Sequence, residues 1–251
     1  MLHTLLKPHR LWGYMVILTL MGCGNPKIIE DTAQLDQAFI PLLYVSEHVD
    51  TTTTETMRMF DRFVRRWHLF YGNYYTANQI NPKWGQSLDQ INQKVNAIED
   101  SLVDRHSLSG IHTMLEFIRH DLTQLRRENQ IAYPLDEFTA FHAIMDPMWA
   151  AADSIEMQPE KSDQYVKPIL HNMTTAEKQW MRAQMVRIDP ILYELSEEEE
   201  RQLRQGIQAI QSKLNELNAA ANRHDATGMA ELAKAVKHDF EKIYLLFGDF
   251  D

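Results

Sequence analysis

One stretch of the chain occurs twice, and this repeat restricts the fold more than any other feature. Residues 91–125 align with residues 210–243 with a single one-residue gap. Each copy has apolar residues at helical spacing on both sides of a short polar turn. We therefore predict a helix, a turn and a second helix in each half of the chain. The two hairpins could form two similar bundles or one larger pseudo-symmetric bundle.

The composition favours helices throughout. Glycine and proline number only nine each among 251 residues, and no segment has the alternation of a strand. The predicted fold class is all-α, with up-down helical bundles built from two related helical hairpins. From apolar periodicity and capping patterns such as Ser87 with Gln90, Thr174 with Glu177 and Ser196 with Glu199, we expect the following helices. They cover residues 41–75 (with the β-branched run 51–54 as a point of interruption near the start), 87–104, 111–129, 135–155 (with a kink or break at Pro147), 174–189, 196–221 and 226–247.

The N-terminus has the layout of a secretory signal. Lys7 and Arg10 form a basic segment, and an apolar run over residues 11–21 follows it. This run is too short to cross a hydrocarbon core, which requires roughly 20 residues. We predict that residues 1–22 are a signal peptide.

The end of this signal contains the only cysteine of the chain. The segment Leu20-Met21-Gly22-Cys23 resembles the lipobox of bacterial lipoprotein precursors. The resemblance implies that Cys23 receives a diacylglyceryl group, and palmitate, as the mature N-terminus. It also implies a cell-envelope protein held at the membrane through this lipid, and Gly24 favours the outer membrane, facing the periplasm. The other reading is an ordinary signal followed by an incidental cysteine.

The remaining chain divides at changes in pattern. Residues 23–38 are expected to be the lipidated cysteine and a tether, residues 39–156 an N-terminal bundle, residues 157–173 a connector and residues 174–251 a C-terminal bundle.

The charge of the chain excludes one class of partner. Residues 1–22 contain Lys7 and Arg10 but no acid, so 23 basic and 35 acidic residues remain after their removal, a net charge of −12. Such a surface repels the phosphate backbone, and we predict no nucleic-acid partner. No common catalytic motif is present, and the single cysteine is taken up by the lipid. We therefore expect no enzyme, and an enzyme is the third reading after a binding module and a metal-handling protein.

Histidines occupy matching positions in the two copies of the repeat. His120 and His238 both precede an aspartate, and at 100° per residue each lies opposite the apolar stripe of its helix. We expect both to point away from their own core, where they could meet a ligand or a metal; a solvated surface histidine is the other reading.

A third cluster combines imidazole with thioether groups. In the segment FHAIMDPMW, His142, Met145 and Met148 provide ligand types suited to copper or haem iron. Methionine on an apolar stripe also fills cores, so both readings stay open.

The last hairpin has a family resemblance of its own. Residues 203–244 are similar in rhythm to the last two helices of cytochrome b562-like four-helix bundles, and residues 91–125 are a weaker second instance. That family binds haem through a methionine of the first helix and a histidine near the end of the last. No histidine follows His238, which lies one turn too early. The resemblance thus supports the bundle but does not transfer the haem ligand.

Taken together, these features favour a lipid-anchored binding or interaction module of the cell envelope without catalytic activity, with the membrane and an envelope protein as partners. No cofactor is predicted as the leading interpretation. The alternative is a redox or metal-handling lipoprotein that binds copper, zinc or haem.

Overall fold

The computed structural model describes residues 26–48, 53–76, 81–103 and 108–250. This part of the chain is helical and has no strand, which confirms the predicted all-α class. None of its helices is long and apolar enough to cross a membrane. Cys23 and the predicted signal peptide lie outside the described residues. The helices are α1 (Pro26–His48), α2 (Thr54–Tyr74), α3 (Lys83–Val103), α4 (Leu108–Glu128), α5 (Leu135–Met157), α6 (Ser162–Tyr165), α7 (Lys167–Met185), α8 (Glu197–Asn222) and α9 (Ala226–Leu245), with a 3-10 turn at Pro159–Lys161.

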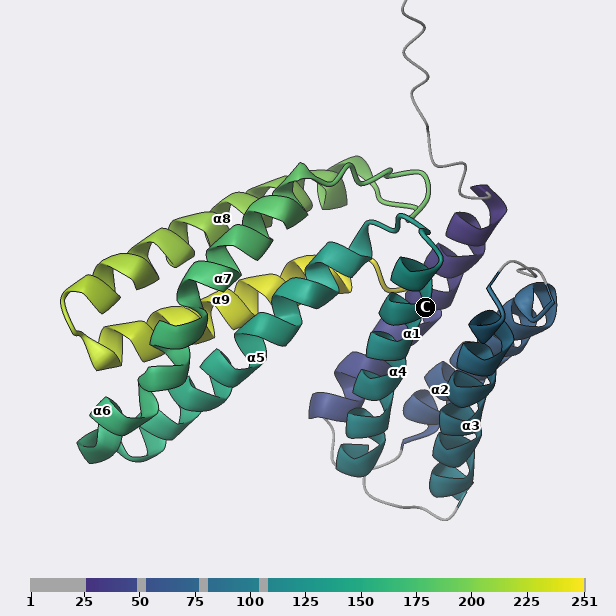
Figure 1. Cartoon of the computed structure of the whole chain (residues 1–251), viewed down its shortest axis with the longest axis horizontal. Coiled ribbons are helices and arrows are strands. Elements are labelled where there is room, and N and C mark those ends of the chain that lie inside the picture. The colour runs from purple at the N-terminus through teal and green to yellow at the C-terminus, as the bar shows by residue number, and fades with distance from the viewer. Residues whose placement is uncertain (1–25, 49–52, 77–80, 104–107, 251) are drawn as a thin grey trace, which may run out of the picture.

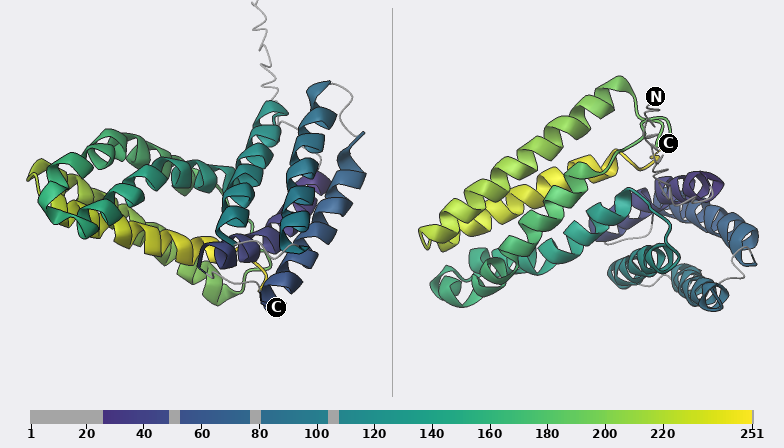
Figure 2. Two further views of the ribbon diagram at one scale, coloured as in Figure 1. Left: turned by 90° about the horizontal axis from the view of Figure 1, so that it is seen from below. Right: turned by 45° about the horizontal axis from the view of Figure 1, so that its top comes forward.

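The long helices of the described chain form two four-helix bundles, whose arrangement is seen in Figures 1 and 2. In the first, α1 packs against α2 and α4, and α3 closes the ring between them. In the second, α5 packs against α7 and α9, and α8 closes the ring. The bundles meet where α1 and α4 touch α9 and α5. Their buried apolar side chains nevertheless form one continuous cluster, so the two bundles share a core.

The repeat corresponds to the second hairpin of each bundle, α3–α4 and α8–α9. Aligned apolar positions are buried in both copies: Ile91 and Ile210, Val95 and Leu214, Ile98 and Leu217, Ile118 and Val236, Leu122 and Phe240. An ion pair between the two helices of the hairpin also recurs. Lys94 binds Asp121 at 2.5 Å in the first copy, and the aligned residues Lys213 and Asp239 pair in the second. These matches support the prediction of two related hairpins.

The start of the fold differs from the prediction. Residues 26–38, expected to be part of a tether, are the first half of α1, and Ala33 and Leu35 are almost completely buried. Thr32 and Asp36 lie on the same buried face. These polar residues interrupt the apolar pattern, which is why the sequence looked like a solvated segment.

The boundary between the bundles also differs. Because α5 packs with α7 and α9, residues 135–156 belong to the second bundle and not to the first. The break lies at residues 129–134, between α4 and α5. Residues 157–173, expected to be a connector, hold the 3-10 turn, α6 and the first turns of α7.

The capping patterns have mixed outcomes. Ser196 and Glu199 form the predicted box at the start of α8: the amide of Ser196 donates to Oε2 of Glu199 (2.8 Å), and the amide of Glu199 donates to Oγ of Ser196 (3.3 Å). Ser87 and Thr174 instead lie inside α3 and α7, so the helix starts predicted there are wrong. Pro147 is accommodated within α5 and does not end it.

A buried polar network joins the bundles beside α5. Nε of Arg126, on α4, donates to both carboxylate oxygens of Asp136, on α5, at 3.0 and 3.1 Å. Asp36, on α1, is buried in the same region. Burial raises the pKa of Asp36 to about 6, because the ion is poorly solvated there, although the charge of Arg126 partly offsets this effect.

Candidate functional site

A cleft of about 390 Å³ opens where the two bundles meet. Helices α1, α4, α5 and α9 all contribute to its wall, so only the assembled pair of bundles creates it. Most of the lining residues are polar or titratable, and Phe117 and Trp149 add two large aromatic side chains. The lining residues are Glu47, His112, Thr113, Glu116, Phe117, His120, His142, Ala143, Asp146, Trp149 and Lys237.

The histidines predicted from the sequence lie at or near this cleft. His120 and His142 both line it, although they come from different bundles. His120 and His238 are exposed on α4 and α9, which confirms that they point away from their own cores. His238 is next to Lys237 along the chain but does not line the cleft.

His142 is the most buried of these histidines. Nη2 of Arg119 donates to its Nδ1 at 2.6 Å, which places the imidazole proton on Nε2. Burial, together with the positive charge of Arg119, holds the pKa of His142 well below its usual value. His142 is therefore a neutral side chain at neutral pH. Met145 and Met148, predicted to act with it, are fully buried in the apolar core and do not line the cleft.

Two buried donors at the site have no hydrogen-bond partner among the described residues. Nε1 of Trp149 is one, and Nε of Arg119 is the other. Trp149 lines the cleft, while Arg119 lines a smaller adjoining cavity that shares Glu47, Glu116 and His142 with it. An unpaired buried donor costs about 1–3 kcal/mol, so such groups are uncommon unless a ligand or water completes them.

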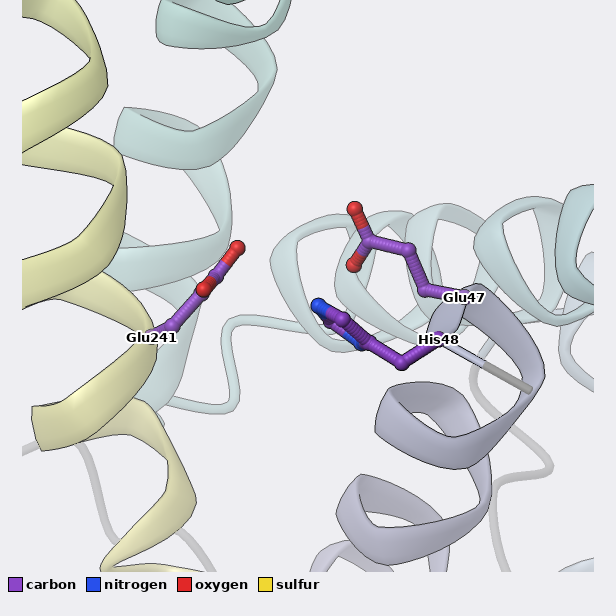
Figure 3. A group of neighbouring side chains, drawn as sticks. All are labelled: Glu47, His48 and Glu241. Atoms are coloured by element: carbon purple, nitrogen blue, oxygen red, sulfur yellow. The ribbon is translucent and has the colours of Figure 1, made fainter.

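A second group of polar side chains includes Glu47, which also lines the cleft (Figure 3). Glu47 and His48 end α1, and Glu241 faces them from α9. One ligand atom from each of the three lies within 4.8 Å of the others. Nδ1 of His48 donates to the carbonyl oxygen of Tyr44 at 2.9 Å, and the two rings are in contact, with centroids 4.3 Å apart and planes tilted by 31°. In the neutral imidazole, this tautomer has its lone pair on Nε2. We call Glu47, His48 and Glu241 the junction triad.

Lys237 forms ion pairs with both carboxylates of the triad. Its Nζ lies 2.8 Å from Glu47 and 3.7 Å from Glu241. Burial disfavours the Glu47 anion, but the hydrogen bond and charge of Lys237 outweigh this, so the pKa of Glu47 is lowered. Burial raises the pKa of Glu241, and the nearby Glu47 anion adds to the rise against the opposing charge of Lys237. Lys237 therefore stabilises the anion of Glu47 more than the anion of Glu241.

Sequence patterns did not indicate several of these residues. His112 and Trp149 follow no motif, and Glu47 is separated from Glu241 by almost the whole described chain. Only the contact of α1 with α9 brings the triad together.

Comparison of the chain with protein families, curated proteins and solved structures found no match. The interpretation of the cleft therefore depends on its own geometry.

Proposed function

We propose that this protein is a lipid-anchored binding module of the cell envelope, without catalytic activity, that binds its partner in the cleft between the two bundles. The partner presents hydrogen-bond acceptors, such as carboxylate or carbonyl oxygens, to the cleft. It is an envelope protein segment or a smaller polar molecule with the same groups.

The unpaired donors carry this proposal. Nε1 of Trp149 and Nε of Arg119 are buried at one junction and lack acceptors among the described residues. A partner that supplies acceptors would recover the free energy that the unpaired donors cost. Nζ of Lys237, 5.7 Å from the centroid of the Trp149 ring, adds positive charge at the same wall.

The proposed anchor fits the start of the fold. Cys23 precedes the first residue of α1, Pro26, by three positions, which an extended chain covers in about 10 Å. A lipid on Cys23 would hold the first bundle against the membrane surface. Two acyl chains on one cysteine are sufficient for stable anchoring.

Photo-crosslinking in intact cells tests the binding site. A photoreactive amino acid at Ala143, an exposed residue of the cleft, should give adducts in the membrane fraction, detected by gel shift for proteins and by intact mass for small molecules. Ala219, exposed on α8, is the matched control and should give none of these adducts. Replacement Trp149→Phe, which keeps the ring and removes the donor, should reduce the yield at Ala143. Equal adduct yields at Ala143 and Ala219, or no adducts at Ala143, would refute the proposed site.

A second function, metal handling, is favoured by one separate observation. This is the junction triad, whose ligand atoms converge at the cleft edge.

A further inference from the structure

The junction triad combines side chains that metal ions use. Glu47 and His48 come from the last turn of α1, and Glu241 comes from near the C-terminal end of α9 (Figure 3). An imidazole and two carboxylates form a nitrogen and oxygen ligand set without sulfur, which suits Zn²⁺ and similar divalent transition metals. Neither Cu⁺ nor haem iron is favoured by such a set.

The distances allow all three groups to reach one ion. The ligand atoms of a tetrahedral Zn²⁺ ion, with bonds of about 2.0–2.2 Å, lie about 3.4 Å apart. The ligand atoms of the triad lie within 4.8 Å of one another, so small side-chain rotations bring them to bonding distance. Glu47 and His48 are exposed and have room for these rotations.

His48 already has the orientation of a metal-binding histidine. Metal-bound histidines usually donate their second ring N–H to a carbonyl or carboxylate, which fixes the tautomer and directs the other nitrogen to the metal. Nδ1 of His48 makes this bond to the carbonyl oxygen of Tyr44 at 2.9 Å, and the Tyr44 ring packs against the imidazole. Nε2 of His48 is therefore the free ligand nitrogen.

The electrostatic environment favours a cation between the two carboxylates. Glu47 and Glu241 share Lys237, whose Nζ is closer to Glu47 than to Glu241. A divalent ion would neutralise both carboxylates at once, which one ammonium group does less completely.

We propose that Glu47, His48 and Glu241 form a binding site for a divalent transition metal ion, with Zn²⁺ as the reference ion, that links the end of α1 to α9. Three protein ligands leave open coordination positions at the cleft edge. Because Glu47 also lines the cleft, the ion would lie beside the proposed binding site.

A competition titration with Zn²⁺ and a chromophoric chelator tests the site. The full-length protein is purified in detergent and stripped with EDTA, and every variant carries Cys23→Ser because a thiolate would bind Zn²⁺ itself. We expect one tight site per chain, and His48→Ala and Glu241→Gln should each weaken it by about 10-fold or more. The matched controls are His68→Ala, exposed on α2, and Glu231→Gln, exposed on α9 about 15 Å along the helix from Glu241.

The test compares the Zn²⁺ affinities of the triad variants with those of the control variants. If His48→Ala and Glu241→Gln bind Zn²⁺ as tightly as His68→Ala and Glu231→Gln, the triad is not the site and the proposal is refuted. Circular dichroism of each variant shows whether the helices are retained, as expected for substitutions at the surface.

Lys237→Gln gives a second, opposite test. Removing the ammonium group that competes for the carboxylates should tighten Zn²⁺ binding, whereas unchanged or weaker binding would place the ion elsewhere.

The inference goes beyond the proposed binding function. Its failure is distinguishable from a failure of that function, because crosslinking at Ala143 requires no added metal.

Discussion

Replacement of Asp36 by asparagine should stabilise the protein at neutral pH but not in acid. Asp36 is 6% exposed, and its pKa is about 6 in the folded state against 3.8 for an unperturbed carboxyl group. Between about pH 4 and pH 6 the folded state therefore keeps a proton that the unfolded state has released. Because the folded state binds more protons, the free energy of unfolding falls as the pH rises through this window.

The magnitude follows from the difference in pKa. About two pKa units correspond to about 3 kcal/mol of stability that is present below pH 4 and lost above pH 6. An asparagine side chain cannot ionise, so the variant Asp36→Asn lacks this loss. The free energy of unfolding of the variant minus that of the wild type should therefore be about 3 kcal/mol larger at pH 7 than at pH 4.

Urea denaturation followed by circular dichroism at pH 4, 5, 6 and 7 measures this difference. Other titrating groups are common to both proteins and cancel in the comparison. Asp61→Asn, exposed on α2, is the matched surface control, and the pH dependence of Asp36→Asn should exceed that of this control because it arises from burial. A stability difference for Asp36→Asn that does not change with pH, or that changes in the opposite direction, would refute the reasoning.

Three further substitutions test the packing of the bundles by urea denaturation. Asp136→Ala leaves the Arg126 guanidinium buried without its partner and should cost about 3–5 kcal/mol; a loss below about 1 kcal/mol would contradict the buried pair. Gly206→Ala should destabilise by about 1–3 kcal/mol, although this change usually favours a helix, because the new Cβ on α8 would overlap Cγ2 of Ile243. An increase in stability would show that α8 and α9 are farther apart. Ser196→Ala removes the cap of α8 and should cost about 1 kcal/mol, and an unchanged denaturation midpoint would rule out the capping box.

The fold was more predictable than its boundaries. Helical periodicity placed the two repeated hairpins and the outward direction of His120 and His238, since one turn of a helix fixes which side chains share a face. Capping patterns were less informative. The spacing of Thr174 and Glu177 also occurs inside a helix, so it did not mark the start of α7.

Buried polar residues account for the main error in the fold. Asp36 and Thr32 made the first half of α1 look like a solvated tether, although Asp36 is tolerated there through the nearby charge of Arg126. The local sequence around a buried acid does not show whether a basic residue on another helix lies close to it.

The candidate site was predictable only in part. His120 and His142 were found from the repeat and from residue type, and both line the cleft. The junction triad was not, because Glu47 and His48 meet Glu241 only through the contact between the two bundles. Periodicity reports which face of a helix is buried, but it does not report which distant helix lies opposite.

Mass spectrometry of the N-terminal peptide tests most directly the claim that the protein is an anchored envelope module. The protein is extracted from the membrane fraction of cells in which a lipoprotein pathway is active, and its N-terminal peptide is sequenced with its modification. The account predicts a peptide that begins at Cys23 and carries a diacylglyceryl group, and a loss of membrane association in Cys23→Ala. A mature N-terminus at another residue, or an unmodified Cys23 in membrane-bound protein, would contradict it.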